Sequence, residues 1–247
     1  MKKSQIQLVC LLLLTNITVV KADTILGLYA GYSYWQHDMA DGLILESSDR
    51  NIKRSETGNV FYVALEHPVP FLPNIKLQHN NISAKGSSNY QVIGIFGLDT
   101  IYVNDKSDLE HTDFTFYYEI LDNWVNLDLG LSAKYFTGFT HDFSYTSGQE
   151  GVYFAGRNDL DEWVPLLYAK GQFDLPFTGL SAYGSIQALG MDSNDVTDLE
   201  LGVNYESKSG LGAVLGYRSL DVDFKKHGAT TLNTKVDGFF VGINFHF

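Results

Sequence analysis

Apolar and polar residues alternate with a period of two along many segments of this chain, each about ten to thirteen residues long. In the segment 124–137, the odd-numbered positions from Val125 to Tyr135 are apolar, and the even-numbered positions from Asn126 to Lys134 are polar or small. This is the period of a β-strand whose two faces meet different surroundings. The pattern therefore predicts strands with one apolar face and one polar face.

Ten segments show this pattern, and the links between them differ in length. The segments are 25–36, 59–68, 74–84, 109–120, 124–137, 163–175, 179–190, 196–207, 210–222 and 235–247. Short links, at 67–74, 121–123, 176–178 and 207–209, alternate with mostly longer polar ones near 37–58, 85–108, 138–162, 191–195 and 223–234. Short turns at one end and long loops at the other are typical of outer-membrane barrels. We therefore predict an all-β fold, a closed antiparallel transmembrane β-barrel of about ten strands with short periplasmic turns and long extracellular loops.

A soluble β-sandwich or a lipocalin-like barrel is the main alternative, because alternation also arises where one face of a sheet covers a core. The expected strands are longer than the roughly five to six residues usual in soluble sheets, and they match the roughly nine to eleven that cross a bilayer. Strand length therefore favours the membrane barrel.

The last strand also favours a membrane barrel. Its apolar residues alternate up to the final residue: Phe239, Val241, Ile243, Phe245 and Phe247. This ending resembles the terminal signature of outer-membrane β-barrels, which the barrel-assembly machinery reads, so we interpret these residues as a C-terminal assembly signal. Aromatic residues near strand ends are candidates for the girdles at the two membrane interfaces. They are Tyr32, Tyr34, Trp35, Trp124 and Trp163.

The first residues have the pattern of a secretory signal peptide. Lys2 and Lys3 precede the apolar run 6–14, and Val20-Lys21-Ala22 ends the region. Polar residues interrupt the run, so it is too short for a transmembrane anchor. We therefore expect a signal peptide at 1–22 and the outer-membrane barrel at 23–247. The single cysteine, Cys10, lies within the segment that cleavage would remove.

The charge balance limits the possible partners. With 17 Lys+Arg against 29 Asp+Glu, the formal net charge is −12, which repels nucleic acid phosphates and argues against a nucleic-acid role. The expected partners are outer-membrane lipid and lipopolysaccharide, together with the barrel-assembly machinery during biogenesis, and the expected state is a monomer. Arg50, Lys53 and Arg54 form a basic cluster that would either contact lipopolysaccharide phosphates or belong to a solvated loop.

Over most of its length the chain resembles a family of small, uncharacterised outer-membrane β-barrel proteins of Gram-negative bacteria. The resemblance rests on Asp23–Trp35 (DTILGLYAGYSYW), on the turn Glu66–Asn74 (EHPVPFLPN) and on the closing Phe247. It implies a fold and a cell outer membrane location, and it brings no known activity and no functional residues.

Seven charged residues fall on the polar faces of the predicted strands and would meet inside a barrel. They are Asp113, Glu119, Asp128, Lys134, Asp198, Glu200 and Arg218. Barrels of about eight strands are filled by side chains and those of about 16 to 18 hold a channel, so about ten strands predict a largely plugged lumen. We therefore expect Lys134 and Arg218 to neutralise neighbouring carboxylates. The alternative is a narrow, cation-lined pore.

Histidine and aspartate pairs raise a catalytic alternative. His111 and Asp113 share a strand face near a loop-side end, and His37-Asp38 and His141-Asp142 lie in predicted loops. These pairs are loosely similar to those of the omptin proteases, but no family-wide motif matches. The acidic segment 192–195 lacks the glycine and the closing glutamate of a calcium loop.

We therefore expect an integral outer-membrane β-barrel protein with a structural or loop-mediated interaction role. We expect no catalytic residue, no cofactor and no bound metal. The alternatives that stay open are a narrow cation-preferring, porin-like diffusion channel and an outer-rim hydrolase that uses an Asp/His pair.

Overall fold

The computed structural model describes residues 26–41, 52–69, 71–94, 97–147, 153–191, 194–227 and 230–247, and these residues form β-strands joined by turns. The strands are β1 (Gly27–Asp41), β2 (Ile52–Glu66), β3 (Asn74–Asn81), β4 (Ser83–Gly94), β5 (Gly97–Asp108), β6 (His111–Leu121), β7 (Val125–Phe136), β8 (Phe139–Ser147), β9 (Tyr153–Asp159), β10 (Glu162–Leu175), β11 (Leu180–Met191), β12 (Asn194–Glu206), β13 (Leu211–His227) and β14 (Thr230–His246). None of the described residues forms a helix with the length and apolar character needed to cross a membrane.

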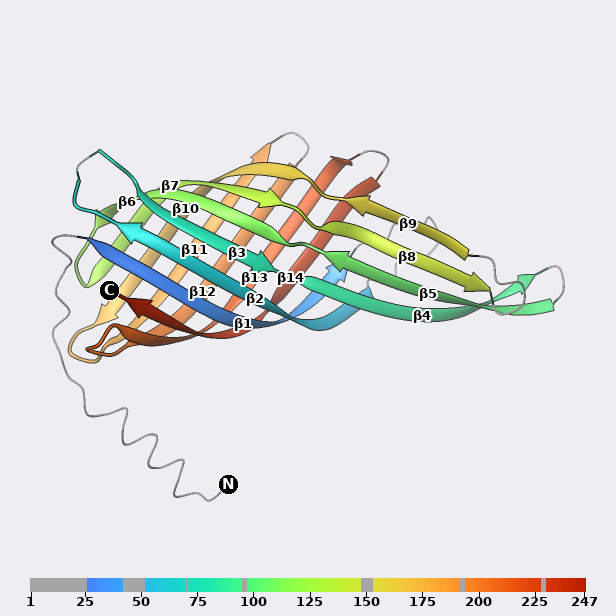
Figure 1. Cartoon of the computed structure of the whole chain (residues 1–247), viewed down its shortest axis with the longest axis horizontal. Coiled ribbons are helices and arrows are strands. Elements are labelled where there is room, and N and C mark those ends of the chain that lie inside the picture. The colour runs from blue at the N-terminus through green and yellow to red at the C-terminus, as the bar shows by residue number, and fades with distance from the viewer. Residues whose placement is uncertain are drawn as a thin grey trace, which may run out of the picture.

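Ten of these strands form a closed antiparallel barrel (Figure 1). Their order around the barrel is β1-β14-β13-β12-β11-β10-β7-β6-β3-β2. The first strand closes it by pairing on both sides, with Gly27 opposite Glu66 of β2 and Tyr29 opposite His246 of β14. The predicted closed barrel of ten antiparallel strands is thus confirmed.

The other four strands continue the barrel wall as a separate sheet in the order β4-β5-β8-β9, which we call the extension. It projects from the end of the barrel opposite the C-terminus (Figure 1). Only one or two residues separate each extension strand from its barrel strand: Ile82, 109–110, 137–138 and 160–161. Backbone hydrogen bonds cross these breaks, from Leu109 N to Ile82 O at 2.8 Å and from Leu160 N to Gly138 O at 2.9 Å. Four strand lines therefore run through both the barrel and the extension.

The extension corrects the predicted long loops. Residues 85–108 and 138–162 are mainly strand rather than loop, and β1 and β2 enter the segment 37–58 from its two ends. Outside the bilayer no lipid contacts the outer face of a strand, so polar side chains are tolerated there and the apolar alternation is lost. The backbone hydrogen bonds between strands do not depend on this alternation, so the strands continue. Short links do lie at the opposite end, at 67–73, 122–124, 176–179 and 207–210, as predicted.

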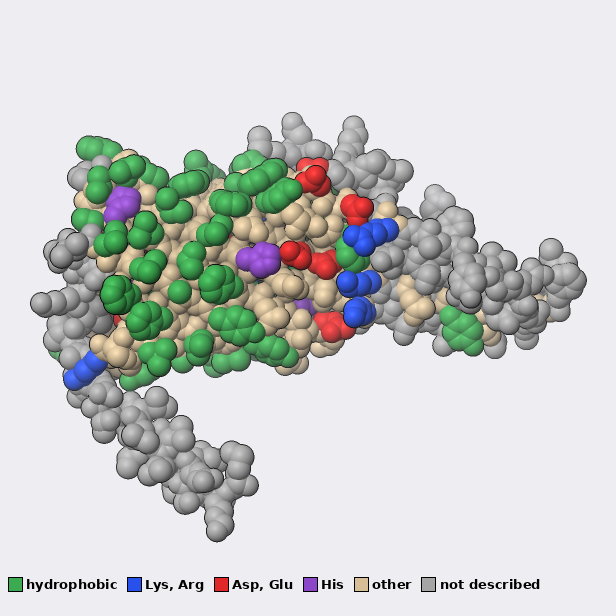
Figure 2. Space-filling view, viewed as in Figure 1, with side chains coloured by type: hydrophobic (Ala, Val, Ile, Leu, Met, Phe, Trp, Pro, Cys, Tyr) green, Lys and Arg blue, Asp and Glu red, His purple; other side chains and the backbone are tan. Residues whose placement is uncertain are grey.

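The outer surface of the barrel is apolar. Large exposed apolar side chains occur on every barrel strand, and Figure 2 shows them spread over the barrel wall. Examples from five strands are Phe61, Phe116, Leu131, Leu167 and Ile243. A surface of this kind is solvated by lipid tails, while the closed ladder leaves no unpaired strand edge in the hydrocarbon.

The predicted aromatic girdle is only partly correct. Tyr32, Tyr34, Trp124 and Trp163 are exposed on the outside, whereas Trp35 is completely buried. The reason is strand parity: β1 directs its odd-numbered residues inward, so Trp35 points into the lumen while Tyr32 and Tyr34 face outward.

Candidate functional site

The lumen holds a buried network of charged side chains. The ammonium group of Lys134 on β7 lies 2.9 and 2.8 Å from the two carboxylate oxygens of Asp113 on β6. It also lies 2.9 Å from Oδ2 of Asp198 on β12. Lys134 has no exposed surface. One ammonium therefore joins carboxylates from two separate parts of the barrel wall.

Arg218 on β13 completes this network. Its Nε and Nη2 donate to the two carboxylate oxygens of Asp198 at 2.9 and 2.6 Å, a bidentate pairing. Its Nη1 donates at 2.7 Å to the side-chain oxygen of Asn80 on β3, which lies elsewhere around the barrel. The guanidinium also lies over the Trp35 ring, 5.0 Å from its centroid. We call Asp113, Lys134, Asp198, Arg218 and Asn80 the brace, because they link strands across the lumen.

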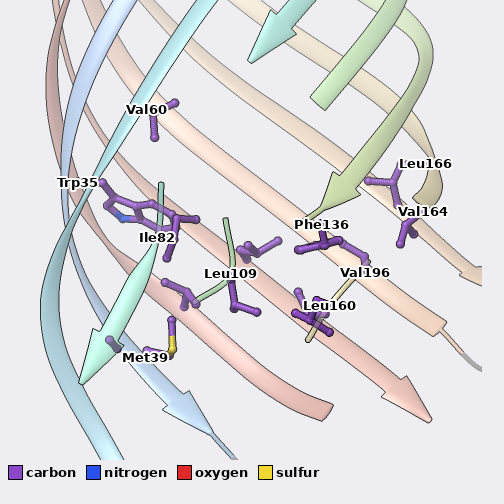
Figure 3. Packing of buried hydrophobic residues seen from close by; sticks show 14 of the residues in the cluster. Trp35, Met39, Val60, Ile82, Leu109, Phe136, Leu160, Val164, Leu166 and Val196 are labelled. Atoms are coloured by element: carbon purple, nitrogen blue, oxygen red, sulfur yellow. The ribbon is translucent and has the colours of Figure 1, made fainter. Parts of the chain in front are cut away.

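Buried apolar side chains form a cluster in the lumen, and Figure 3 shows that they come from several strands. On three strands, the next inward-facing position beyond the brace toward the extension is apolar: Phe136, Leu220 and Val196. Ile82 and Leu109, at breaks between barrel and extension strands, are buried in the same cluster. We call these five residues, Phe136, Leu220, Val196, Ile82 and Leu109, the cap. Sequence reasoning assigned polar character to the whole lumen and missed it.

The lumen on the turn side of the brace is lined by tyrosines and charged residues. The hydroxyl of Tyr117 donates to Glu66 at 2.7 Å, and that of Tyr183 donates to Glu200 at 2.6 Å. Lys170 lies 3.9 Å from Asp128. This part of the lumen is therefore polar and acidic.

The seven predicted lumen charges thus do not form one network. Asp113, Lys134, Asp198 and Arg218 meet in the brace. Asp128 and Glu200 contact other partners on the turn side, and Glu119 is exposed near the end of β6. The difference arises because alternation gives the face of a strand but not the height of a residue along the barrel axis, which depends on the register between strands.

A metal ion does not fit the brace, although two of its residues and a neighbouring histidine are of types that bind metals. His111, Asp113 and Asp198 have ligand atoms within 4.8 Å of one another. The Lys134 ammonium already contacts both carboxylates, and the Arg218 guanidinium contacts one of them. A divalent cation would therefore face two fixed positive charges at short range. The charges of the two carboxylates and the two basic side chains of the brace already neutralise one another.

The histidine and aspartate pairs do not form an open catalytic site in the described residues. His111 has no exposed surface, and its Nδ1 lies 2.7 Å from the carbonyl oxygen of Leu109. His37 is buried, while Asp38 faces the other side of β1. His141 and Asp142 lie on β8 rather than in a loop, and nothing is described of their side chains.

The predicted C-terminal assembly signal forms one outward-facing row on β14 and the residue after it. Phe239, Val241, Ile243, Phe245 and Phe247 are all exposed on the outside of the barrel. Their placement is compatible with reading by another protein before the barrel is embedded, and their role in assembly stays a prediction. The predicted signal peptide at 1–22 lies outside the described residues.

Sequence reasoning missed two uncharged members of the site. Asn80 and Gln78 are buried on β3, and the Gln78 side-chain amide donates to the Asn80 side-chain oxygen at 3.1 Å. Both occupy inward-facing positions of a strand whose outward positions, Ile75 and Leu77, are apolar and exposed. This alternation could have identified both residues, because it places their amides in the lumen, and a buried amide needs hydrogen-bond partners as a buried charge does.

A closed antiparallel barrel with an apolar exterior and an interior filled by side chains is an outer-membrane β-barrel. No family model and no curated protein matches the sequence. Among solved structures, the chain is similar to the translocator domain of the autotransporter NalP from Neisseria meningitidis, with 12% sequence identity, a TM-score of 0.43 and coverage of 90% of this chain and 89% of that one.

Two further solved structures are similar to the chain with lower TM-scores. The P. putida toluene transporter TodX has 8% identity and a TM-score of 0.34, over 91% of this chain and 90% of that one. The beta domain of the Bordetella autotransporter BrkA has 10% identity and a TM-score of 0.35, over 90% and 99%. At these identities and scores, the assignment of the fold rests on the strand pairing of this chain itself.

Proposed function

We propose that the protein is a non-conducting outer-membrane barrel that acts as a structural component and presents its extension for interactions outside the cell. The observation that carries this proposal is the brace, which crosses the lumen with all four charged groups paired and buried. Barrels of this type place their short turns on the periplasmic side, so the extension belongs on the outer side.

An ion that moved through the lumen would meet two successive barriers. It would have to displace Lys134 from Asp113 and Asp198, which costs the pairing of buried charges. It would then enter the cap, where Phe136, Leu220 and neighbouring apolar side chains supply no ligand to replace its water. The acidic turn side attracts cations, but these two layers oppose their passage.

A planar bilayer recording tests the closed lumen. We expect the refolded barrel to show the heat-modifiable gel mobility of a folded barrel and no discrete current steps at any salt concentration. Discrete, cation-selective steps from the wild-type protein would overturn this proposal and favour the narrow channel. The Lys170→Ala variant serves as a control, because Lys170 is partly exposed outside the brace and its loss should leave the recording silent.

Labelling of single cysteines in intact cells tests the position of the extension. The only cysteine in the sequence is Cys10, within the predicted signal peptide, so an introduced cysteine would be the sole thiol of the exported chain. We expect Tyr102→Cys, on β5, to react with a membrane-impermeant maleimide in intact cells. Lys208→Cys, in the turn between β12 and β13, should react only after the outer membrane is permeabilised. The reverse result would place the extension in the periplasm.

A further inference from the structure

Three basic side chains gather on the outer side of the extension, where it leaves the barrel. They are Lys85 on β4, Lys106 on β5 and Arg157 on β9, and each belongs to the face that continues the apolar outer wall of the barrel. Figure 2 shows a row of Lys and Arg side chains at this boundary, beside acidic ones. We call these three residues the basic row.

A phenylalanine holds two members of the basic row together. The Lys106 ammonium lies 4.8 Å and the Arg157 guanidinium 3.8 Å from the centroid of the Phe139 ring, at the start of β8. Phe139 is only 8% exposed, although it is on the outer face. A ring face attracts cations within about 6 Å, so Phe139 fixes two positive charges on one small area.

The charges of the basic row are not fully compensated. Lys106 lies 3.9 Å from Asp108, and Arg157 lies 2.5 Å from Asp159. Lys85 is the direct cross-strand partner of Lys106 and has no carboxylate partner among the described residues. Like charges directly opposite one another destabilise a pair of strands, and a bound anion removes that penalty. Lys85 therefore supplies a positive charge that a negatively charged ligand would neutralise.

The height of the basic row above the apolar wall indicates where this anion would come from. Tyr135 and Trp163 stack on the outer wall with ring centroids 4.5 Å apart, as aromatic residues do at a membrane interface. Phe139 follows Tyr135 by four residues along the same strand line, which corresponds to about 13 Å of strand. That step leads from the hydrocarbon edge into the layer of lipid headgroups, where phosphate groups lie.

We propose that Lys85, Lys106 and Arg157 bind a phosphate group of a phosphorylated glycolipid in the outer leaflet. The Arg157 fork donates hydrogen bonds to phosphate oxygens, and the two ammonium groups supply point charges on either side. The acyl chains of the same lipid lie against the apolar wall below. Of the other basic cluster, Arg50 lies outside the described residues, and nothing is described of the Lys53 and Arg54 side chains near the start of β2.

Binding of diphosphorylated lipid A to the purified protein in detergent, measured by native mass spectrometry, tests this proposal. We expect the triple variant Lys85→Gln/Lys106→Gln/Arg157→Gln to bind about tenfold or more weakly, since hydrogen bonds to charged groups are stronger than those between neutral groups. Lys235→Gln is the matched control, because Lys235 is an exposed outward-facing lysine on β14, outside the extension. It should bind as the wild type does. Heat-modifiable mobility must show that all variants are folded.

Two further binding measurements identify the chemistry of the ligand. Dephosphorylated lipid A should bind the wild type as weakly as the diphosphorylated lipid binds the triple variant, and excess inorganic phosphate should displace little lipid. Phe139→Leu keeps the three cations but removes the ring, so its affinity should lie between those of the wild type and the triple variant. Equal binding by the wild type and the triple variant, equal loss in Lys235→Gln, or full displacement by free phosphate would each overturn the proposal.

Discussion

The barrel and the extension share four strand lines but differ in what surrounds them. Within the barrel, β7 exposes Leu129 and Leu131 on its outer face and buries Lys134 on its inner face. A few residues further on, the outer face carries Phe139, covered by two cations. Backbone pairing is continuous from one part to the other. Backbone hydrogen bonding therefore forms the strands in both parts, whereas the lipid outside and the lumen inside determine the alternation of side chains in the barrel.

The barrel and the extension also differ in the side-chain contacts that stabilise them. The barrel encloses a filled lumen, with charged groups such as Lys134 and apolar groups such as Phe136 completely buried. The extension is a four-stranded sheet with exposed side chains such as Tyr102 on β5, which is 49% exposed. We therefore expect substitutions in the barrel to change the free energy of unfolding far more than substitutions in the extension. Four predictions test this difference, from the largest effect to the smallest.

Replacement of Lys134 should have the largest effect. The Lys134→Ala variant leaves Asp113 buried without its ammonium partner, and removal of one partner from a buried pair costs about 3–5 kcal/mol. Urea unfolding in detergent micelles, followed by the heat-modifiable band on gels, measures this loss.

The double variant Lys134→Met/Asp113→Leu is the matched control for that prediction. It removes both charges, so it should recover much of the stability that Lys134→Ala loses. If Lys134→Ala unfolds within about 1 kcal/mol of the wild type, which is the range of an exposed ion pair, the brace does not stabilise the barrel.

The second-largest effect should come from an arginine substitution on the outer face of the barrel, compared with one in the extension. Leu131 is 61% exposed on the lipid-facing side of β7, so Leu131→Arg should cost about 2–4 kcal/mol, as arginine does near the bilayer midplane. Tyr102→Arg places the same side chain on β5 in the extension and should change stability by less than about 0.5 kcal/mol. Unfolding in lipid vesicles compares the two variants. Equal costs would mean that the outer wall around Leu131 does not face lipid.

This contrast also explains how far the sequence predicts the fold. Alternation predicted all ten barrel strands, because lipid requires an apolar residue at every second position. It failed at 85–108 and 138–162, where strands leave the lipid and polar side chains are tolerated on the outer face. Strand propensity without a burial pattern is a weak signal, so these segments were predicted as loops.

The candidate site was predictable to a similar degree. Parity along each strand assigned Lys134 and Arg218 to the lumen, and the structure pairs both with carboxylates. Parity could not show that Glu119 reaches the open end, or that Trp35 points inward beneath the Arg218 guanidinium. These facts depend on register and on which way the first strand faces, and neither follows from the order of residues within one strand.

The junction between the two parts should be sensitive to small changes. Gly138 lies between β7 and β8, and a Cβ atom there would come within 1.9 Å of the Asp108 carbonyl oxygen. Gly138→Ala must push β5 and β8 apart, at a cost of about 1–3 kcal/mol, as for other overpacked sites. Faster amide hydrogen exchange at Leu160, whose N–H donates to Gly138 O, would report the separation. Gly171→Ala is the control, because a Cβ at Gly171 meets nothing within 4 Å. It should leave the stability and the exchange rate at Leu160 unchanged.

Shortening the extension should have the smallest effect of the four. Ser87 on β4 pairs with Asn104 on β5, so replacing residues 88–103 with Asn-Gly closes the same two strands with a two-residue turn. The brace and the cap involve none of the removed residues, so the barrel should unfold within about 1 kcal/mol of the wild type. The same urea titration measures this change. A large loss would show that the extension helps to close the barrel, and the division between a stable barrel and a dispensable outer sheet would then be wrong.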